Sequence, residues 1–114
     1  MIKASCHCGS VQLEVPTPPE NVTRCNCSIC SKLGGLWAYY DPAVVNLATN
    51  RDAIDTYIWG DKMIQICRCS TCGCTTHWES IDPEITGRMG INSRMMADID
   101  LDQIPVRHVD GASF

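Results

Sequence analysis

The sequence predicts a single, mostly β domain spanning residues 1–114, and three features of the chain lead to this expectation. Apolar and β-branched residues fall into short runs that Pro, Gly and Asp interrupt. No stretch shows the sustained periodicity of a long helix. The chain has 114 residues, 45% of them hydrophobic, which suits one domain with a modest core.

Each expected strand has its own local pattern. Val11, Leu13 and Val15 alternate with polar residues, and Pro16 ends this first strand. Further strands are expected at residues 36–40, 54–59, 63–67, 75–79, 88–92 and 104–109. Pro105 favours an edge position for the last of them. Helical signal is limited to single turns at residues 27–33 and 98–101.

Nine cysteines form the most informative feature, because they are clustered along the chain. An odd number leaves one thiol over in any purely intramolecular set of disulfides. The first residues run directly into a cysteine cluster and carry no signal-peptide pattern. We therefore expect a reducing, cytoplasmic setting in which the clusters bind metal. The clusters comprise Cys6 and Cys8; Cys25, Cys27 and Cys30; and Cys67, Cys69, Cys72 and Cys74.

Two of these cysteine pairs predict a closed zinc site. Cys69-x-x-Cys72-Gly73 has the spacing of a zinc knuckle, in which a tight turn presents two sulfurs to one ion. Cys6 and Cys8 offer two more sulfurs, which would share one side of an extended strand. Four thiolates complete the coordination of zinc, so this site would be structural.

The middle cluster predicts a different kind of site. Cys25, Cys27 and Cys30 supply three ligands and leave the fourth position of a second zinc ion open, as in catalytic zinc sites. The alternatives are that the three are buried thiols, or that one of the extra cysteines of the third cluster closes the site. Arg24 and Lys32 flank the cluster, and either could hold a carboxylate or lower a thiol pKa.

The remaining candidate ligands have simpler interpretations. Cys67 and Cys74 are expected to be core thiols unless one of them closes the middle site. His77 is interpreted as a strand residue rather than a metal ligand, with a possible role beside Trp78 in a pocket as a proton carrier. His7 lies next to cysteines that bind zinc better.

Composition also excludes some partners. The formal net charge is −4, and no run of Lys or Arg occurs, so the basic footprint of a nucleic-acid-binding protein is missing. No apolar stretch of about 20 residues occurs, so we expect no membrane span. The expected partners are small molecules.

Taken together, the three clusters resemble the glutathione-dependent formaldehyde-activating enzyme family, which also contains centromere protein V. The resemblance rests on Cys-x-Cys-Gly-x-Val from Cys6, Cys-x-Cys-x-x-Cys-x-Lys-x-x-Gly from Cys25 and Cys-x-x-Cys-Gly from Cys69. It implies a β-tent fold, in which small antiparallel sheets meet around a structural zinc. It also implies two zinc ions, held by Cys6, Cys8, Cys69 and Cys72 and by Cys25, Cys27 and Cys30.

The same resemblance implies an activity. The family's named enzyme joins glutathione to formaldehyde, so this chain is expected to be a carbon–sulfur lyase acting on a thiol–aldehyde adduct. Cys25, Cys27 and Cys30 would be its catalytic residues, and Lys32 would contact the co-substrate. The alternatives are a non-catalytic zinc-stabilised binding module and a sensor of thiols or zinc.

Overall fold

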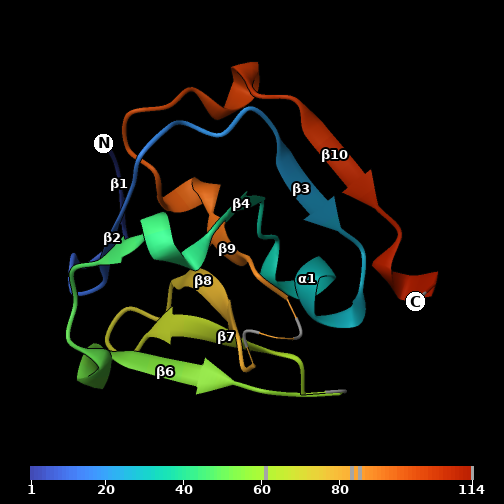
Figure 1. Ribbon diagram of the computed structural model, residues 1–114, viewed down its shortest axis with the longest axis horizontal. Coiled ribbons are helices and arrows are strands. Elements are labelled where there is room, and N and C mark those ends of the chain that lie inside the picture. Colours follow the sequence, from blue (N-terminus) through green and yellow to red (C-terminus); the bar gives the residue numbers. More distant parts are fainter. Residues whose placement is uncertain (61, 83, 85, 114) are drawn as a thin grey trace.

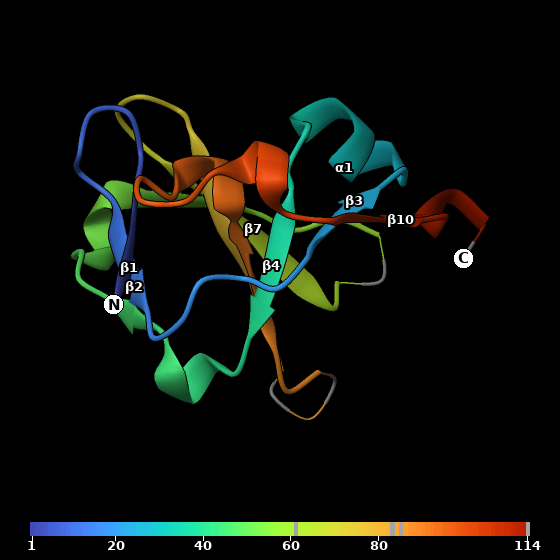
Figure 2. The same ribbon diagram turned by 90° about the horizontal axis from the view of Figure 1, so that it is seen from above.

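The computed structural model describes residues 1–60, 62–82, 84 and 86–113, and it consists of two β-sheets with little helix (Figure 1). A three-stranded antiparallel sheet has the order β1-β2-β5, and a seven-stranded sheet has the order β10-β3-β4-β9-β8-β7-β6. The small sheet lies at one end of the molecule, whereas β3, β10 and helix α1 lie at the other (Figure 2). The expected mostly β fold is confirmed.

The strands are β1 (Ile2–Ser5), β2 (Gln12–Val15), β3 (Val22–Cys25), β4 (Trp37–Tyr40), β5 (Asn46–Leu47), β6 (Ile54–Tyr57), β7 (Ile64–Cys69), β8 (Thr75–Ser80), β9 (Met89–Asn92) and β10 (Val106–Val109). The α-helix is α1 (Ser28–Leu33), and short 3-10 turns occur at Pro42–Val44, Arg51–Ala53, Ser93–Met95, Leu101–Gln103 and Gly111–Ser113. Within the described residues, no helix has the length and apolar character needed to cross a membrane.

Every strand expected from the sequence is present, with ends shifted by a few residues, but β1, β3 and β5 were not expected. Half of β3 is polar, so its local pattern does not identify it as a strand. The turn expected at residues 98–101 forms later, at Leu101–Gln103. β10 is an edge strand, as Pro105 indicated, and it pairs with β3 in parallel, which makes the large sheet mixed.

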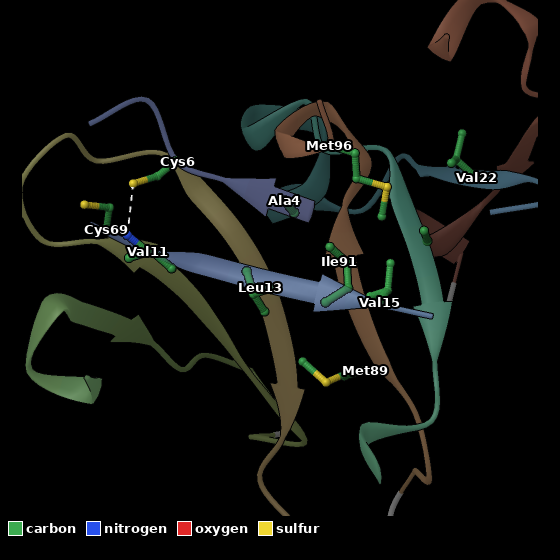
Figure 3. Packing of buried hydrophobic residues seen from close by; sticks show 11 residues of the cluster. Ala4, Cys6, Val11, Leu13, Val15, Val22, Cys69, Met89, Ile91 and Met96 are labelled. Atoms are coloured by element: carbon green, nitrogen blue, oxygen red, sulfur yellow. Dashed lines mark hydrogen bonds between the residues drawn. The ribbon is translucent and has the colours of Figure 1, made fainter. Parts of the chain in front are cut away.

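The main core lies between the two sheets. Leu13 and Val15 of β2 are fully buried, as their alternation predicted, and they pack with Met89 and Ile91 of β9 (Figure 3). Burying one such aliphatic side chain contributes about 1.5–3 kcal/mol to folding. This contact fixes the small sheet against the centre of the large one.

Strand β8 lies inside the large sheet and is buried on both faces. Trp78 packs with Trp37 and Ile66 in a second core cluster. His77 pairs in register with Ile91 of the main core, so these two side chains share one face of the sheet. Trp78, the next residue along β8, points to the other face. This strand therefore carries polar and aromatic side chains into both cores.

The absence of a side chain at Gly90 makes room for the ring of Trp78. The two residues pair in register on β9 and β8, and a Cβ atom at Gly90 would overlap the indole Nε1. We predict that Gly90→Ala lowers the free energy of unfolding in denaturant by about 1–3 kcal/mol, the usual cost of overpacking. Gly87→Ala is the control, because a Cβ atom there meets open space. Equal stability of the two variants would contradict this packing.

Candidate functional site

The four cysteines expected to form a closed site converge in the structure. Cys6 and Cys8 lie in the loop after β1, Cys69 ends β7, and Cys72 lies in the turn before β8. Their sulfurs all lie within 4.8 Å of one another, with Cys8 Sγ 3.5 Å from Cys69 Sγ and 3.7 Å from Cys6 Sγ. Neighbouring sulfurs around a tetrahedral zinc would be about 3.8 Å apart, so the spacing fits this ion.

Tight turns present these sulfurs, which corrects one expectation from the sequence. Cys6 and Cys8 do not lie on an extended strand, because β1 ends at Ser5 and the chain reverses through Gly9, whose φ is +84°. The Val11 N–H donates to Cys6 Sγ at 3.2 Å, as drawn in Figure 3. Two sulfurs of a short turn can face one ion only if the backbone reverses, which a left-handed glycine permits.

The Cys69 turn is built in the same way. The N–H groups of Thr71 and Cys72 both donate to Cys69 Sγ at 3.4 Å, and Gly73 follows with a φ of +79°. Backbone N–H donors, first that of Cys74, lower the pKa of the Cys72 thiol to about 5, whereas burial raises that of Cys6 to about 11. At neutral pH, Cys72 is therefore available as a thiolate, and a cation would have to displace the proton of Cys6. Such a donor set suits a cation of the zinc class.

The second cluster is assembled locally at the junction of β3 and α1. Cys25 ends β3, Cys27 is the N-cap of α1, and Cys30 lies in the helix, with all three sulfurs within 4.8 Å of one another. Gly34 closes the helix in the left-handed conformation and donates its N–H to the Cys30 carbonyl at 3.0 Å. The short helix thus brings the three sulfurs together.

Hydrogen bonding and burial give these thiols different acidities. Burial alone would raise the pKa of Cys27, but the Cys30 N–H, 3.5 Å from Cys27 Sγ, and the neighbouring thiols lower it overall. Burial and the adjacent Cys27 side chain raise the pKa of Cys30 to about 12. All three residues are only partly buried. The cluster therefore combines one thiol whose pKa is lowered with a neighbour that a cation would have to deprotonate.

Neither extra cysteine completes this second cluster among the described residues. Cys67 Sγ lies instead with the side chains of His77 and Glu79, and Cys74 packs against the main core. The three sulfurs thus form a group of their own, which matches the three-ligand arrangement of an open zinc site.

The C-terminal segment covers one side of the second cluster. The Asn26 side chain donates to Asp110 Oδ1 at 2.9 Å and accepts from the Ala112 N–H at 3.0 Å. These bonds seat Gly111 so close to Cys25 that an added Cβ atom would overlap the sulfur. Sequence reasoning identified neither Asn26 nor Gly111, because their role depends on a contact between residues more than 80 positions apart.

A polar cavity of about 210 Å³ lies beside the second cluster. Cys25 and Cys30 line it, together with the guanidinium-bearing residues Arg24 and Arg94. Arg94 lies in the 3-10 turn after β9, and its Nε donates to the Gly34 carbonyl at 3.0 Å. No local sequence pattern marks Arg94, since only the fold brings it to the cysteines.

A second, more apolar cavity of about 280 Å³ adjoins the same cluster from another direction. Cys27 and Cys30 line it with Trp59 and Ile64. Lys32, which the sequence suggested as a co-substrate contact, is exposed in the last turn of α1 and is not among the residues that line either cavity. The cysteines therefore lie between a basic cavity and an apolar one.

The comparisons with known proteins agree with this architecture. The crystal structure of a Rhodobacter sphaeroides protein from a structural genomics programme superposes with a TM-score of 0.78, covering 92% of this chain and 99% of that one at 25% identity. A Halomonas elongata protein named "Putative glutathione-dependent formaldehyde-activating enzyme" is 38% identical over 55 residues. That stretch covers 47% of this chain and 32% of the relative, so the chain spans about a third of the relative's length. No family model matches the chain.

Serine substitutions should separate the roles of the two clusters. Cys69→Ser removes a buried sulfur that joins distant strands, and structural zinc contributes on the order of 10 kcal/mol, so we predict loss of cooperative thermal unfolding. Cys27→Ser removes a half-exposed sulfur but keeps a good N-cap for α1, so we predict a folded protein with less bound zinc. Circular dichroism and metal analysis provide the test. Two equally folded variants would refute this division.

Proposed function

We propose that this protein is a zinc-dependent enzyme of the carbon–sulfur lyase type, acting on the adduct of a thiol such as glutathione with formaldehyde or a similar small aldehyde. The observation that carries the proposal is the second cluster, in which three half-buried sulfurs meet beside a cavity with two arginines. A purely structural site would need neither a missing fourth ligand nor a cavity.

The similarity to the Halomonas elongata protein supports the choice of substrates. The name of that relative gives glutathione dependence and formaldehyde activation, and it describes a longer protein than this chain. Glutathione is an anionic thiol with two carboxylates. Arginine binds carboxylates through paired, charge-assisted hydrogen bonds, so Arg24 and Arg94 are suited to hold such a molecule in the cavity.

The donor set supports zinc as the resident ion of both clusters. Cys6, Cys8, Cys69 and Cys72 would hold one ion in a closed structural site, and Cys25, Cys27 and Cys30 would hold the other with one position open. When bound, the second ion would supply Lewis acidity and favour the thiolate form of sulfur ligands. Free thiols at these positions would be kept reduced in the cytoplasm, which we propose as the setting.

The chain's own residues would position the reactants around the proposed reaction. In the forward direction a carbon–sulfur bond forms between the thiol and the aldehyde carbon, and the thiol proton is transferred to the aldehyde oxygen. Arg24 and Arg94 would fix the thiol's carboxylates, and the packed Asn26 and Gly111 would hold the cysteine loop in place. Fixing the geometry of two reactants in this way accelerates an addition that also proceeds unaided.

Substitution of Arg94 tests the substrate assignment. With the zinc-loaded protein, NMR exchange spectroscopy should show faster exchange between formaldehyde and glutathione than in buffer alone. Arg94→Gln should raise the glutathione concentration at half-maximal rate about tenfold or more, because a charge-assisted hydrogen bond contributes about 1.5–3 kcal/mol. Arg107→Gln should change little, because Arg107 on β10 donates to Thr23 on β3 and does not line the cavity.

The same assay decides between the proposed function and its alternatives. Lys32→Gln should have a smaller effect than Arg94→Gln, since Lys32 is exposed and would act only through its charge. If both cysteine clusters of the wild-type protein hold zinc and it still gives no rate above buffer, the enzyme proposal fails. A binding module or a sensor would then explain the open cluster better.

A further inference from the structure

A third group of candidate ligands lies outside both cysteine clusters. Cys67 on β7 pairs in register with His77 on β8, and Glu79 follows two residues later on the same face. Cys67 Sγ is 3.4 Å from Glu79 Oε1, and His77 Nε2 is 3.9 Å from the same oxygen. Cys67 and His77 are fully buried, and the three donor atoms lie within 4.8 Å of one another.

The hydrogen bonds of Thr76 favour one tautomer of His77. The Thr76 hydroxyl donates to the Cys67 carbonyl at 3.4 Å, and its oxygen lies 2.8 Å from His77 Nδ1. The arrangement that satisfies both contacts has the hydroxyl proton on the Cys67 carbonyl and a proton on His77 Nδ1, which donates to the Thr76 oxygen. The other ring nitrogen, Nε2, is then a bare lone pair, and it has no hydrogen-bond partner among the described residues.

Three electron-pair donors therefore converge on one buried place. His77 Nε2 lies 3.9 Å from Glu79 Oε1, and the Cys67 thiol donates to that oxygen rather than to the ring. Burial lowers the pKa of His77 to about 4. A lone pair held against a carboxylate is unfavourable unless a cation lies between the two groups.

The charges of the group suit a divalent ion. Burial raises the pKa of the Cys67 thiol to about 12, so a bound ion would have to displace its proton. A divalent ion with one thiolate, one carboxylate and a neutral imidazole is electrically neutral as a unit, which lowers the cost of burying it. Sulfur, imidazole nitrogen and carboxylate oxygen are together the ligands that zinc prefers.

Hydrogen bonds from neighbouring residues orient the candidate ligands Glu79 and His77. Arg51 bonds both carboxylate oxygens of Glu79 at 2.8 Å, and the Gln65 amide donates to Oε1 at 3.2 Å. Thr76 holds the imidazole by the nitrogen that faces away from the group. Metal-binding carboxylates and histidines are held in this way by a surrounding shell of hydrogen bonds.

The group borders a cavity through Glu79. This cavity has a volume of about 400 Å³ and is bounded by Asp41, Ser80 and Met89 among others, whereas Cys67 and His77 do not line it. An ion could enter through this cavity, and a fourth ligand could be taken from solvent on the same side.

We propose that Cys67, His77 and Glu79 form a third metal site, which takes a divalent ion of the zinc class independently of the two cysteine clusters. This proposal revises two interpretations made from the sequence: Cys67 as a core thiol or a ligand closing the middle site, and His77 as a strand residue rather than a metal ligand. It does not depend on the proposed enzymatic activity.

Cadmium-113 NMR of the full chain tests the site without any activity assay. Wild-type protein, reduced and loaded with cadmium, should give three resonances, and the third should be the least deshielded because its ion has one sulfur ligand. With ¹⁵N-labelled histidine, this third ion should show scalar coupling to Nε2 of His77, while His7→Asn and His108→Asn leave the coupling unchanged. Two resonances, or a third without coupling to His77, would overturn the proposal.

A matched pair of variants provides a second measurement by native mass spectrometry. Glu79→Gln removes a ligand and an ion pair, whereas Arg51→Gln removes the same ion pair and keeps all three donors. We expect Glu79→Gln to hold one metal ion fewer than the wild type and Arg51→Gln to hold the wild-type number. Equal metal content in the wild type and Glu79→Gln would overturn the proposal. If Glu79→Gln does not fold, the proposal is decided by whether the cadmium spectrum of the wild type shows scalar coupling to His77 Nε2.

Discussion

The convergence of two cysteine pairs is the constraint on which the arrangement of the two sheets depends. Cys6 and Cys8 belong to the loop between β1 and β2 of the small sheet, whereas Cys69 and Cys72 belong to the turn between β7 and β8 of the large one. The core between the sheets is modest, with aliphatic rather than aromatic side chains. A metal ion held by this four-sulfur cluster would give a small protein the crosslink that such a core lacks.

The second cluster differs from the first in how the chain assembles it. Its three sulfurs come from one short segment, so its formation needs only the end of β3 and the first turn of α1. Its surroundings, by contrast, come from distant parts of the chain, with Arg94 reaching the rim from the turn after β9 and Gly111 packing on Cys25. The donor set is therefore local, whereas the residues around it depend on the tertiary fold.

Local spacing explains why part of the structure could be predicted from the sequence and part could not. The alternation before Pro16 and the β-branched run from Ile54 identify strands, and the spacing of Cys69 and Cys72 identifies a knuckle, because each pattern lies within a few residues. Arg94 and Gly111 gain their positions from tertiary contacts. The grouping of Cys67 with His77 depends on the register between β7 and β8, which no single segment encodes.

The long separation within the first cluster has a consequence for biosynthesis. Cys8 and Cys69 are 61 positions apart, so the first pair leaves the ribosome well before its partners exist. At about 5–20 residues per second, the delay is about 3–12 s. During this interval Cys6 and Cys8 form only half a site, with two thiols exposed to oxidants and to competing metals. The order of translation thus leaves Cys6 and Cys8 without Cys69 and Cys72 until β7 and its turn have emerged.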